Sequence, residues 1–321
     1  MRKLILAVLL PLLLLILPTG CDIKNTVNTN DSIDSTTLRM GVVPTLDCLP
    51  FYIAQDKGIF LNLGLDIQLF TYSCAMNCDT AFLRRHLDCS VSDIVKAQIW
   101  NADGDSIHGL MTTDLRLYLL TSRQARIMNK ESIKEKIIAI TRNSVCDMTL
   151  DHISQSVKLQ QNEVNKPQIN DFDVRLGMLT QNQYDGALLP EPYASMAMQR
   201  GARRIGDSKD YCKDLALLVA HHNTVKDRHN DLALLVKAYN IAVDTINSHI
   251  KADQGRQLLS SLPVNGLEND TTLVLSPFRH AALPTDSCLA KAKEWAQGRE
   301  LITTKSTYKN LIDSAFVKTA K

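Results

Sequence analysis

The chain has 321 residues, with 36 Lys and Arg against 34 Asp and Glu, which gives a formal net charge of +2. Two of the basic residues, Arg2 and Lys3, lie at the extreme N-terminus, and the remaining charges balance. A balanced chain has no electrostatic basis for binding nucleic acid, and about 300 residues are enough for two lobes or one large domain.

The N-terminus has the pattern of a secretory signal. Arg2 and Lys3 precede an apolar run from Leu4 to Leu17, which is too short to span a membrane comfortably. The stretch "LPTGC" that ends at Cys21 resembles a bacterial lipobox, in which the cysteine is acylated and becomes the mature N-terminus. We therefore expect a signal peptide over residues 1–20 and acyl chains such as palmitate on Cys21, which would anchor the protein to a bacterial membrane. A plain signal peptide with a chance cysteine is the alternative.

A polar segment follows Cys21. Residues 22–37 lack aromatic side chains and are rich in Asn, Asp, Ser and Thr, so they cannot build a core. We interpret residues 21–37 as a lipidated tether. No later apolar run reaches about 18 residues, so the sequence predicts no further membrane span.

Short apolar strands alternate with helices in the first part of the mature chain. The sequence predicts strands at 38–43, 65–70 and 89–92, each followed by a helix, at 48–60, 76–87 and 93–104. This order predicts parallel strands joined by right-handed crossovers.

A second alternation begins after a longer apolar strand, Leu115–Ser122. Strands are expected at 136–141 and 186–189, and helices at 145–158, 174–181 and 192–200. Another long strand, Asp214–His221, precedes a mostly helical C-terminal part. We expect two α/β lobes, the first formed by 38–110 with 222–321 and the second by 123–211, joined by link strands within 111–122 and 212–221.

Three segments carry a resemblance to a known family. "MGVVPTLDCLPFYIAQDKGIFLNLGLDIQLF" resembles the opening of periplasmic solute-binding proteins of ABC importers, closest to the branch with sulfonate, nitrate, taurine and thiamine-precursor binders. "KIIAITRNSVCD" and "RLGMLTQNQYDGALLPEPYASMA" resemble that family's second lobe. The resemblance implies a type II periplasmic-binding-protein fold, α/β in class, with two lobes and a ligand cleft between them. Each lobe would be a mostly parallel sheet flanked by helices.

The same resemblance implies a function. It predicts an extracytoplasmic binding protein, without catalytic activity or cofactor, that captures a small organic solute. The solute would pass to an ABC permease and its ATPase subunit.

The expected ligand site lies beyond the carboxyl ends of the strands, where helix N-termini offer free N–H groups. Five loops meet this description, three in the first lobe and two in the second. Their candidate ligand-binding residues are Thr45, Asp47, Cys48, Tyr72, Ser73, Cys74, Ser92, Asp93, Thr141, Asn143, Ser144, Glu191 and Tyr193.

Most of these side chains have a second interpretation. The three acids, Asp47, Asp93 and Glu191, and the polar pair Asn143 and Ser144 either contact the ligand or cap the helices. Tyr72 and Tyr193 either stack on a flat ligand or are ordinary half-buried residues, and the cysteines would shape the pocket. The five loops contribute three acids against one base, Arg142, which favours a neutral or amine-bearing organic ligand over an anion.

Seven cysteines follow Cys21, so at least one stays free or pairs between chains. Cys74, Cys78, His86 and Cys89 suggest a zinc site as an alternative function, but their spacing departs from that of structural zinc sites. We expect buried or cleft-lining thiols instead.

An enzyme of the same fold is the other alternative, because certain menaquinone-pathway enzymes resemble solute-binding proteins. The sequence carries no nucleophile signature and no H-E-x-x-H motif. His221 and His222 are adjacent rather than four residues apart, and we expect them at the surface.

Overall fold

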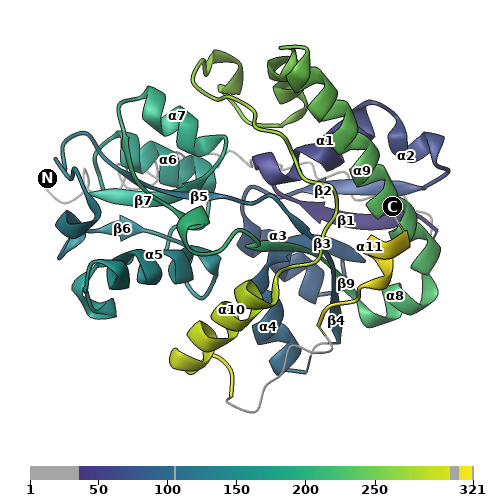
Figure 1. The fold of residues 1–321 in the computed structure, drawn as a ribbon, viewed down its shortest axis with the longest axis horizontal. Coiled ribbons are helices and arrows are strands. Elements are labelled where there is room, and N and C mark those ends of the chain that lie inside the picture. The colour runs from purple at the N-terminus through teal and green to yellow at the C-terminus, as the bar shows by residue number, and fades with distance from the viewer. Residues whose placement is uncertain (1–35, 105, 304–310, 320–321) are drawn as a thin grey trace, which may run out of the picture. The chain divides into compact units, whose positions relative to one another are not determined.

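The computed structural model describes residues 36–104, 106–303 and 311–319 (Figure 1). The chain divides into two units, 1–35 and 36–321, and the fold below is that of the second unit. The expected signal peptide, Cys21 and most of the tether lie outside the described residues. No described helix is both long enough and apolar enough to cross a membrane.

The first sheet has five strands in the order β2-β1-β3-β9-β4. β1 pairs in parallel with β2 and β3, whereas β9 runs antiparallel to both β3 and β4. Only β9 is therefore reversed in this sheet. The strands are β1 (Leu38–Val42), β2 (Ile67–Thr71), β3 (Cys89–Asp93), β4 (Ile107–Thr113) and β9 (Ala216–His221).

The second sheet has four strands in the order β6-β7-β5-β8. β6 and β7 are parallel, and β5 is antiparallel to both β7 and β8, so again one strand is reversed. The strands are β5 (Leu117–Thr121), β6 (Ile138–Ala139), β7 (Gly186–Pro190) and β8 (Arg203–Asp207). The expected fold class, α/β with two lobes and mostly parallel sheets, is confirmed.

Helices cover the faces of both sheets (Figure 1). Around the first sheet lie α1 (Leu49–Asp56), α2 (Ile59–Asn62), α3 (Ala75–Leu83), α4 (Ile94–Ala102), α8 (His222–Asp227), α9 (His229–Lys251) and α11 (Ala315–Thr319). Around the second lie α5 (Val145–Ser156), α6 (Phe172–Thr180) and α7 (Tyr193–Gln199). Pro50 lies in the first turn of α1, where its missing N–H has no consequence, and Gly58 separates α1 from α2 with a φ of 66°.

The two expected link strands are the reversed strands of the sheets. The sequence predicts 115–122 and 214–221 as connections between lobes, but β5 pairs within the second sheet and β9 within the first. The chain passes from one sheet to the other in the short segments 114–116 and 208–215. β4 and β8 were not expected from the sequence, because β4 contains a glycine and a β-bulge and β8 is a half-exposed edge strand.

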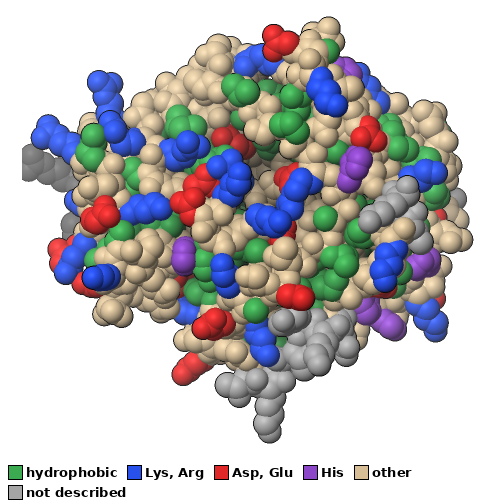
Figure 2. Space-filling view, viewed as in Figure 1, with side chains coloured by type: hydrophobic (Ala, Val, Ile, Leu, Met, Phe, Trp, Pro, Cys, Tyr) green, Lys and Arg blue, Asp and Glu red, His purple; other side chains and the backbone are tan. Residues whose placement is uncertain are grey.

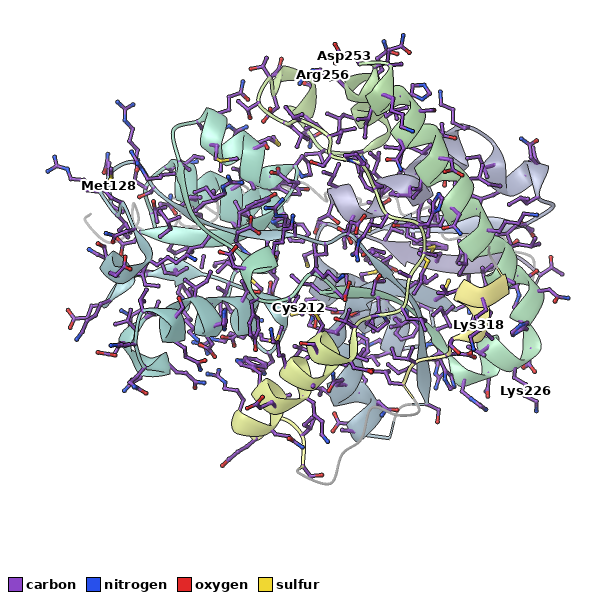
Figure 3. All side chains as sticks on the ribbon, viewed as in Figure 1. Met128, Cys212, Lys226, Asp253, Arg256 and Lys318 are labelled. Atoms are coloured by element: carbon purple, nitrogen blue, oxygen red, sulfur yellow. A yellow bond between two sulfur atoms is a disulfide. The ribbon has the colours of Figure 1, made fainter. Side chains whose placement is uncertain are left out.

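Helix α10 (Asp286–Gly298) packs against α4 of the first lobe and α5 of the second. A disulfide between Cys212 and Cys288, with Cα atoms 5.6 Å apart, joins it to the second segment that connects the sheets. Figure 3 labels Cys212 in the middle of the structure, beside one end of this helix. The pairing was left open by the sequence, and the five other described cysteines are free and buried, as expected.

One surface expectation is wrong. His221 ends β9 and is buried, because its ring stacks on Phe82 with centroids 3.9 Å apart. Its Nε2 lies 2.8 Å from the carbonyl oxygen of Phe82. The neighbouring His222 is exposed, as expected, and its Nδ1 lies 3.0 Å from Nε2 of His108.

Candidate functional site

The strand ends of the two sheets face a common region with two cavities. In the first sheet, Asp93 at the end of β3 and Thr113 at the end of β4 both pair with Ala216 of β9. In the second sheet, Leu117 of β5 pairs with Pro190 at the end of β7. A cavity of about 70 Å³, which we call the inner pocket, lies beside one of about 320 Å³, which we call the outer pocket. The two pockets share three lining residues, Asp47, Leu115 and Pro190.

The inner pocket brings together six of the expected ligand-binding residues. They come from strand ends and loops of both lobes and are Thr45, Asp47, Ser92, Asp93, Thr141 and Ser144. Glu191 lines the outer pocket, together with Asp47. Six others line neither of these two cavities: Cys48, Tyr72, Ser73, Cys74, Asn143 and Tyr193.

Asp93 is both a helix cap and the centre of the inner pocket. Its Oδ1 accepts hydrogen bonds from the backbone N–H groups of Val95 and Lys96, each 2.9 Å long, at the start of α4. Val145, at the start of α5 in the other lobe, lines the same pocket. Burial raises the pKa of Asp93 to about 6, although Lys96 and the backbone donors oppose the shift. The inner pocket thus has the start of a helix from each lobe in its wall.

The sequence missed the lysine of the inner pocket. Lys96 lies one turn into α4 and pairs with Asp79, which also accepts a 2.7 Å hydrogen bond from the hydroxyl of Ser92. The ammonium group keeps its charge, because Asp79 and Asp93 raise its pKa against the desolvation that lowers it. One feature of the sequence could have identified Lys96 as a pocket residue. It comes three residues after Asp93, which places it in the first turn of α4.

The sequence also missed the arginine of the inner pocket. Arg175 in α6 is 1% exposed, and its guanidinium donates to the carbonyl oxygens of Ile169 and Leu188, each 2.7 Å away. It also donates to the hydroxyl of Thr141 at 2.7 Å, which fixes that side chain at the pocket wall. Burial lowers the pKa of Arg175. Arg142, the base counted from the sequence, is exposed and donates to the carbonyl oxygen of Lys166.

Ser144 caps α5, which is one of the two roles that the sequence predicts for it. Its hydroxyl oxygen accepts a 3.1 Å hydrogen bond from the N–H of Cys146 and donates to the carbonyl of Thr141 at 2.7 Å. Asn143 next to it is exposed, adopts a φ of 51°, and donates its backbone N–H to Asp147 at 3.3 Å.

Asp47 lies where the two pockets meet and is 3% exposed. Its Oδ1 accepts a 2.7 Å hydrogen bond from the hydroxyl of Thr45, and its Oδ2 accepts one of the same length from Thr113. Burial raises its pKa, while the two hydroxyl donors lower it. In the described part of the chain, no cationic side chain forms an ion pair with this carboxylate.

Glu191 supports the start of α7. Its Oε2 accepts a 3.0 Å hydrogen bond from the backbone N–H of Ser195, and burial raises its pKa. The expected N-cap assignment is off by one residue, because Pro192 occupies that position. The carbonyl oxygen of Glu191 accepts a 2.8 Å bond from the N–H of Leu46, which joins loops of the two lobes.

The tyrosine and cysteine residues expected at the ligand site line neither pocket. Tyr193 is 1% exposed and packs against Phe172 with ring centroids 5.2 Å apart, so its expected place in the cleft is wrong. The hydrophobic face of α7 turns it into the core of the second lobe. Cys48 and Cys74 are buried, Tyr72 is half-buried and Ser73 is exposed.

The three cysteines considered for zinc, Cys74, Cys78 and Cys89, are free and buried. Cys78 is buried 3.1 Å from the hydroxyl of Ser90, and burial raises the pKa of its thiol to about 12. His86 is exposed. Across the described ranges, no group of three or more His, Cys, Asp or Glu side chains could hold a metal ion.

The outer pocket carries charges of both signs. Arg116 pairs with Asp207, and Arg279 pairs with Asp114 and Asp214. Figure 2 shows basic side chains gathered near the middle of one face, with acidic side chains among them. The remaining charged residues that line this pocket are Asp47, Glu191, Lys209 and Lys213.

No family model matches the sequence, and no curated protein matches it. Several solved structures match the fold. The ligand-binding component of an ABC-type import system from Staphylococcus aureus, with zinc bound, is similar with a TM-score of 0.75 and 11% identity, over 89% of this chain and 99% of that one. The alkanesulfonate-binding protein SsuA from Xanthomonas axonopodis pv. citri, bound to MOPS, gives 0.73 and 13%, over 87% and 99%.

An enzyme is also among the similar structures. The desulfurization enzyme DSZB has a TM-score of 0.64 and 13% identity, over 88% of this chain and 98% of that one. At these identities the matches establish the fold, which is the two-lobed fold of periplasmic binding proteins. The resemblance expected from the sequence is therefore confirmed at the level of the fold.

Proposed function

We propose that the protein is the extracytoplasmic substrate-binding component of an ABC-type importer, which captures a small organic solute between its lobes and delivers it to a permease and its ATPase subunit. The observation that carries the proposal is the inner pocket. Strand ends and the loops that follow strands in both sheets supply its polar groups, Thr45 and Ser92 from the first lobe and Thr141 from the second. A solute bound there would take hydrogen bonds from both lobes at once.

The connections between the sheets suit a closing motion. Short segments, 114–116 and 208–215, join the strands of the two sheets, so a few backbone rotations would change the angle between the lobes. Closure would bury the solute and exclude water from the polar groups around it. A permease that recognises the closed form would then receive only the loaded protein.

Native mass spectrometry of the purified protein tests the binding role. We expect a co-purified small molecule that is lost on unfolding and that binds again, unchanged, to the refolded protein. A molecule that the protein converts to a product would favour the second candidate, an enzyme on this fold, which the similarity to DSZB supports. Failure to find any bound molecule, either from the cell or from added candidates, would contradict both roles.

We also propose that Cys21 carries the lipid anchor of this binding protein. The sequence "LPTGC" supports it, and the first strand of the described fold, β1, begins at Leu38, well after Cys21. Cys21→Ala is therefore expected to yield a folded protein that leaves the membrane fraction, whereas Cys74→Ala, with its thiol inside the fold, stays there. Retention of the Cys21→Ala protein after a high-salt wash would contradict a lipid anchor.

A further inference from the structure

We infer that the solute is an organic cation, an amine-bearing molecule whose positive group pairs with Asp47. The inference rests on the proposed function, because it assigns the chemical class of the solute. It depends on which charges of the two pockets already have partners within the protein and which do not.

One helix start at the inner pocket that would attract an anion is already occupied. An anionic ligand is usually held by N–H groups at helix starts. Here the carboxylate of Asp93 accepts hydrogen bonds from Val95 and Lys96 at the start of α4. An anion at this position would have to displace an internal carboxylate or lie beside it, and like charges repel.

The cations of the inner pocket are also occupied. The ammonium group of Lys96 is paired with Asp79. The guanidinium of Arg175 donates to two backbone carbonyl oxygens and to the hydroxyl of Thr141. An anionic ligand would therefore gain little from either side chain.

Asp47 differs from Asp93 because no helix start donates to its side chain in the described part of the chain. The carboxylate is buried, and among the described side chains it forms no ion pair and accepts hydrogen bonds from the hydroxyls of Thr45 and Thr113, one to each oxygen. Each carboxylate oxygen can accept a second hydrogen bond. An uncompensated buried carboxylate is unfavourable, and a bound ammonium group would relieve this cost.

The position of Asp47 makes it accessible from both cavities. It lines the inner pocket and the outer pocket, so a solute whose body occupies either of them would bring its charge to the same carboxylate. The outer pocket, at about 320 Å³, has the volume of a typical site for a small organic ligand.

A second carboxylate of the outer pocket favours the same charge. Glu191 accepts a hydrogen bond from the N–H of Ser195 and forms no ion pair with any described residue. The bond from Leu46 N–H to its carbonyl oxygen holds this loop beside the one that carries Asp47. Of the bases, Arg116 and Arg279 are paired with acids, and Lys209 and Lys213 are exposed to solvent.

A purely structural role for Asp47 makes a different prediction. The carboxylate connects Thr45 to Thr113 and so holds the loop after β1 against the end of β4. If that were its whole function, Asp47→Asn would change the stability of the protein but would not discriminate between charged and neutral ligands.

Thermal-shift measurements and calorimetry with matched probes separate these possibilities. The cationic probes are choline and putrescine, the neutral probes are their isosteres dimethylbutanol and butanediol, and the anionic probes are nitrate and propanesulfonate. We expect at least one cationic probe to raise the melting temperature of the wild type, and its neutral isostere to have no effect. In Asp47→Asn the affinity for that probe is expected to fall roughly tenfold or more, the loss of one charge-assisted hydrogen bond.

Asp171→Asn is the matched control, since Asp171 caps α6 through the N–H of Val174 and lines neither pocket. It is expected to bind the cation as the wild type does. If Asp47→Asn does not fold, the comparison of putrescine with butanediol on the wild type decides, and equal binding contradicts the inference.

The remaining outcomes separate the inference from the proposed function. Stabilisation by neutral or anionic probes alone would overturn the cationic class and leave the binding role in place. If neither these probes nor a co-purified molecule binds, the binding role and the inference fail together.

Discussion

At the residue scale, Glu191 combines two roles that the sequence presents as alternatives, support of a helix start and a place at the ligand site. The sequence places it either as a cap or as a ligand contact, and the structure gives it the capping bond to Ser195 and also a place in the wall of the outer pocket. These roles have different consequences for stability and for affinity, so they can be separated by two substitutions.

Glu191→Ala is expected to lower the free energy of unfolding by about 1 kcal/mol, because α7 loses a side-chain acceptor at its start. Glu191→Gln is expected to keep most of that stability, since its amide oxygen can still accept from Ser195. Urea unfolding measures both. Equal losses for the two variants would show that the charge, rather than the hydrogen bond, supports the helix.

The carboxylate of Asp93 predicts a pH dependence. Its pKa is about 6 in the folded state, against about 3.9 for an unfolded Asp. Between these values the folded state binds more protons than the unfolded state, so the contribution of Asp93 to stability decreases as pH rises through about 4 to 6 and is constant above that range.

Asn at position 93 cannot titrate. The difference in unfolding free energy between Asp93→Asn and the wild type is therefore expected to move in favour of the variant as pH rises from about 4 to about 7. Urea unfolding across that range measures it. A difference that stays constant with pH would show that the backbone donors at the start of α4 offset desolvation at this site.

The sequence located some site residues and missed others for physical reasons. Thr45 comes shortly after β1, and Ser92 and Asp93 end β3, so the strand pattern places them at the sheet edge. Arg175 lies within a helix and reaches the pocket only through the packing of α6 on the second sheet, which no local pattern reveals. Tyr193 was misplaced because its direction depends on how α7 packs against Phe172.

At the scale of elements, the disulfide joins helix α10 to a distant segment of the sequence. Cys212 and Cys288 are 76 residues apart in sequence. Closing a loop of this length in the unfolded chain corresponds to roughly 4 kcal/mol in the chain-entropy model. Cys212→Ser is expected to lower the free energy of unfolding by up to this amount.

The control for this variant is Cys74→Ser, which removes a free thiol. A reducing agent should destabilise the wild type and Cys74→Ser but leave Cys212→Ser unchanged. If reduction does not alter the melting temperature of the wild type, the disulfide does not form in the folded protein.

The strands show where a sequence pattern is sufficient and where it fails. β1 is mostly apolar, β3 is buried along its whole length, and their alternation with helices predicts them and their parallel pairing. The sequence also identifies β5 and β9 as strands, but their reversed direction is set by pairing with strands about 70 to more than 120 residues away in sequence. That information is absent from any local window.

At the scale of the whole described unit, a closing cleft predicts a change in size. A solute that contacts both lobes should stabilise the closed form, so the radius of gyration from small-angle scattering should decrease when the solute is added. The same measurement on Asp47→Asn should need a higher solute concentration for the same change. A solute that binds tightly without altering the scattering curve would contradict the closing motion.

The division into lobes is the part of the architecture that the sequence predicts best in outline. The two rounds of strand–helix alternation and the family resemblance both indicate it. The bounds of the lobes stay a prediction, because α10, assigned to the first lobe, packs against helices of both. Only the three-dimensional packing reveals this shared contact.

Helix α10 implies that the lifetime of the bound complex is controlled partly at a distance from the solute. The indole N–H of Trp295 donates a 2.9 Å hydrogen bond to Asp151 of α5, and Arg299, just after α10, lies 3.4 Å from Asp147. Any opening that separates α5 from α4 must break or slide these contacts, so their free energy adds to the barrier for solute escape. Trp295→Phe should therefore speed dissociation of the solute in stopped-flow measurements while leaving every group around the solute in place. An unchanged rate would mean that the lobes open by rotating about α10, without breaking its contacts with α5.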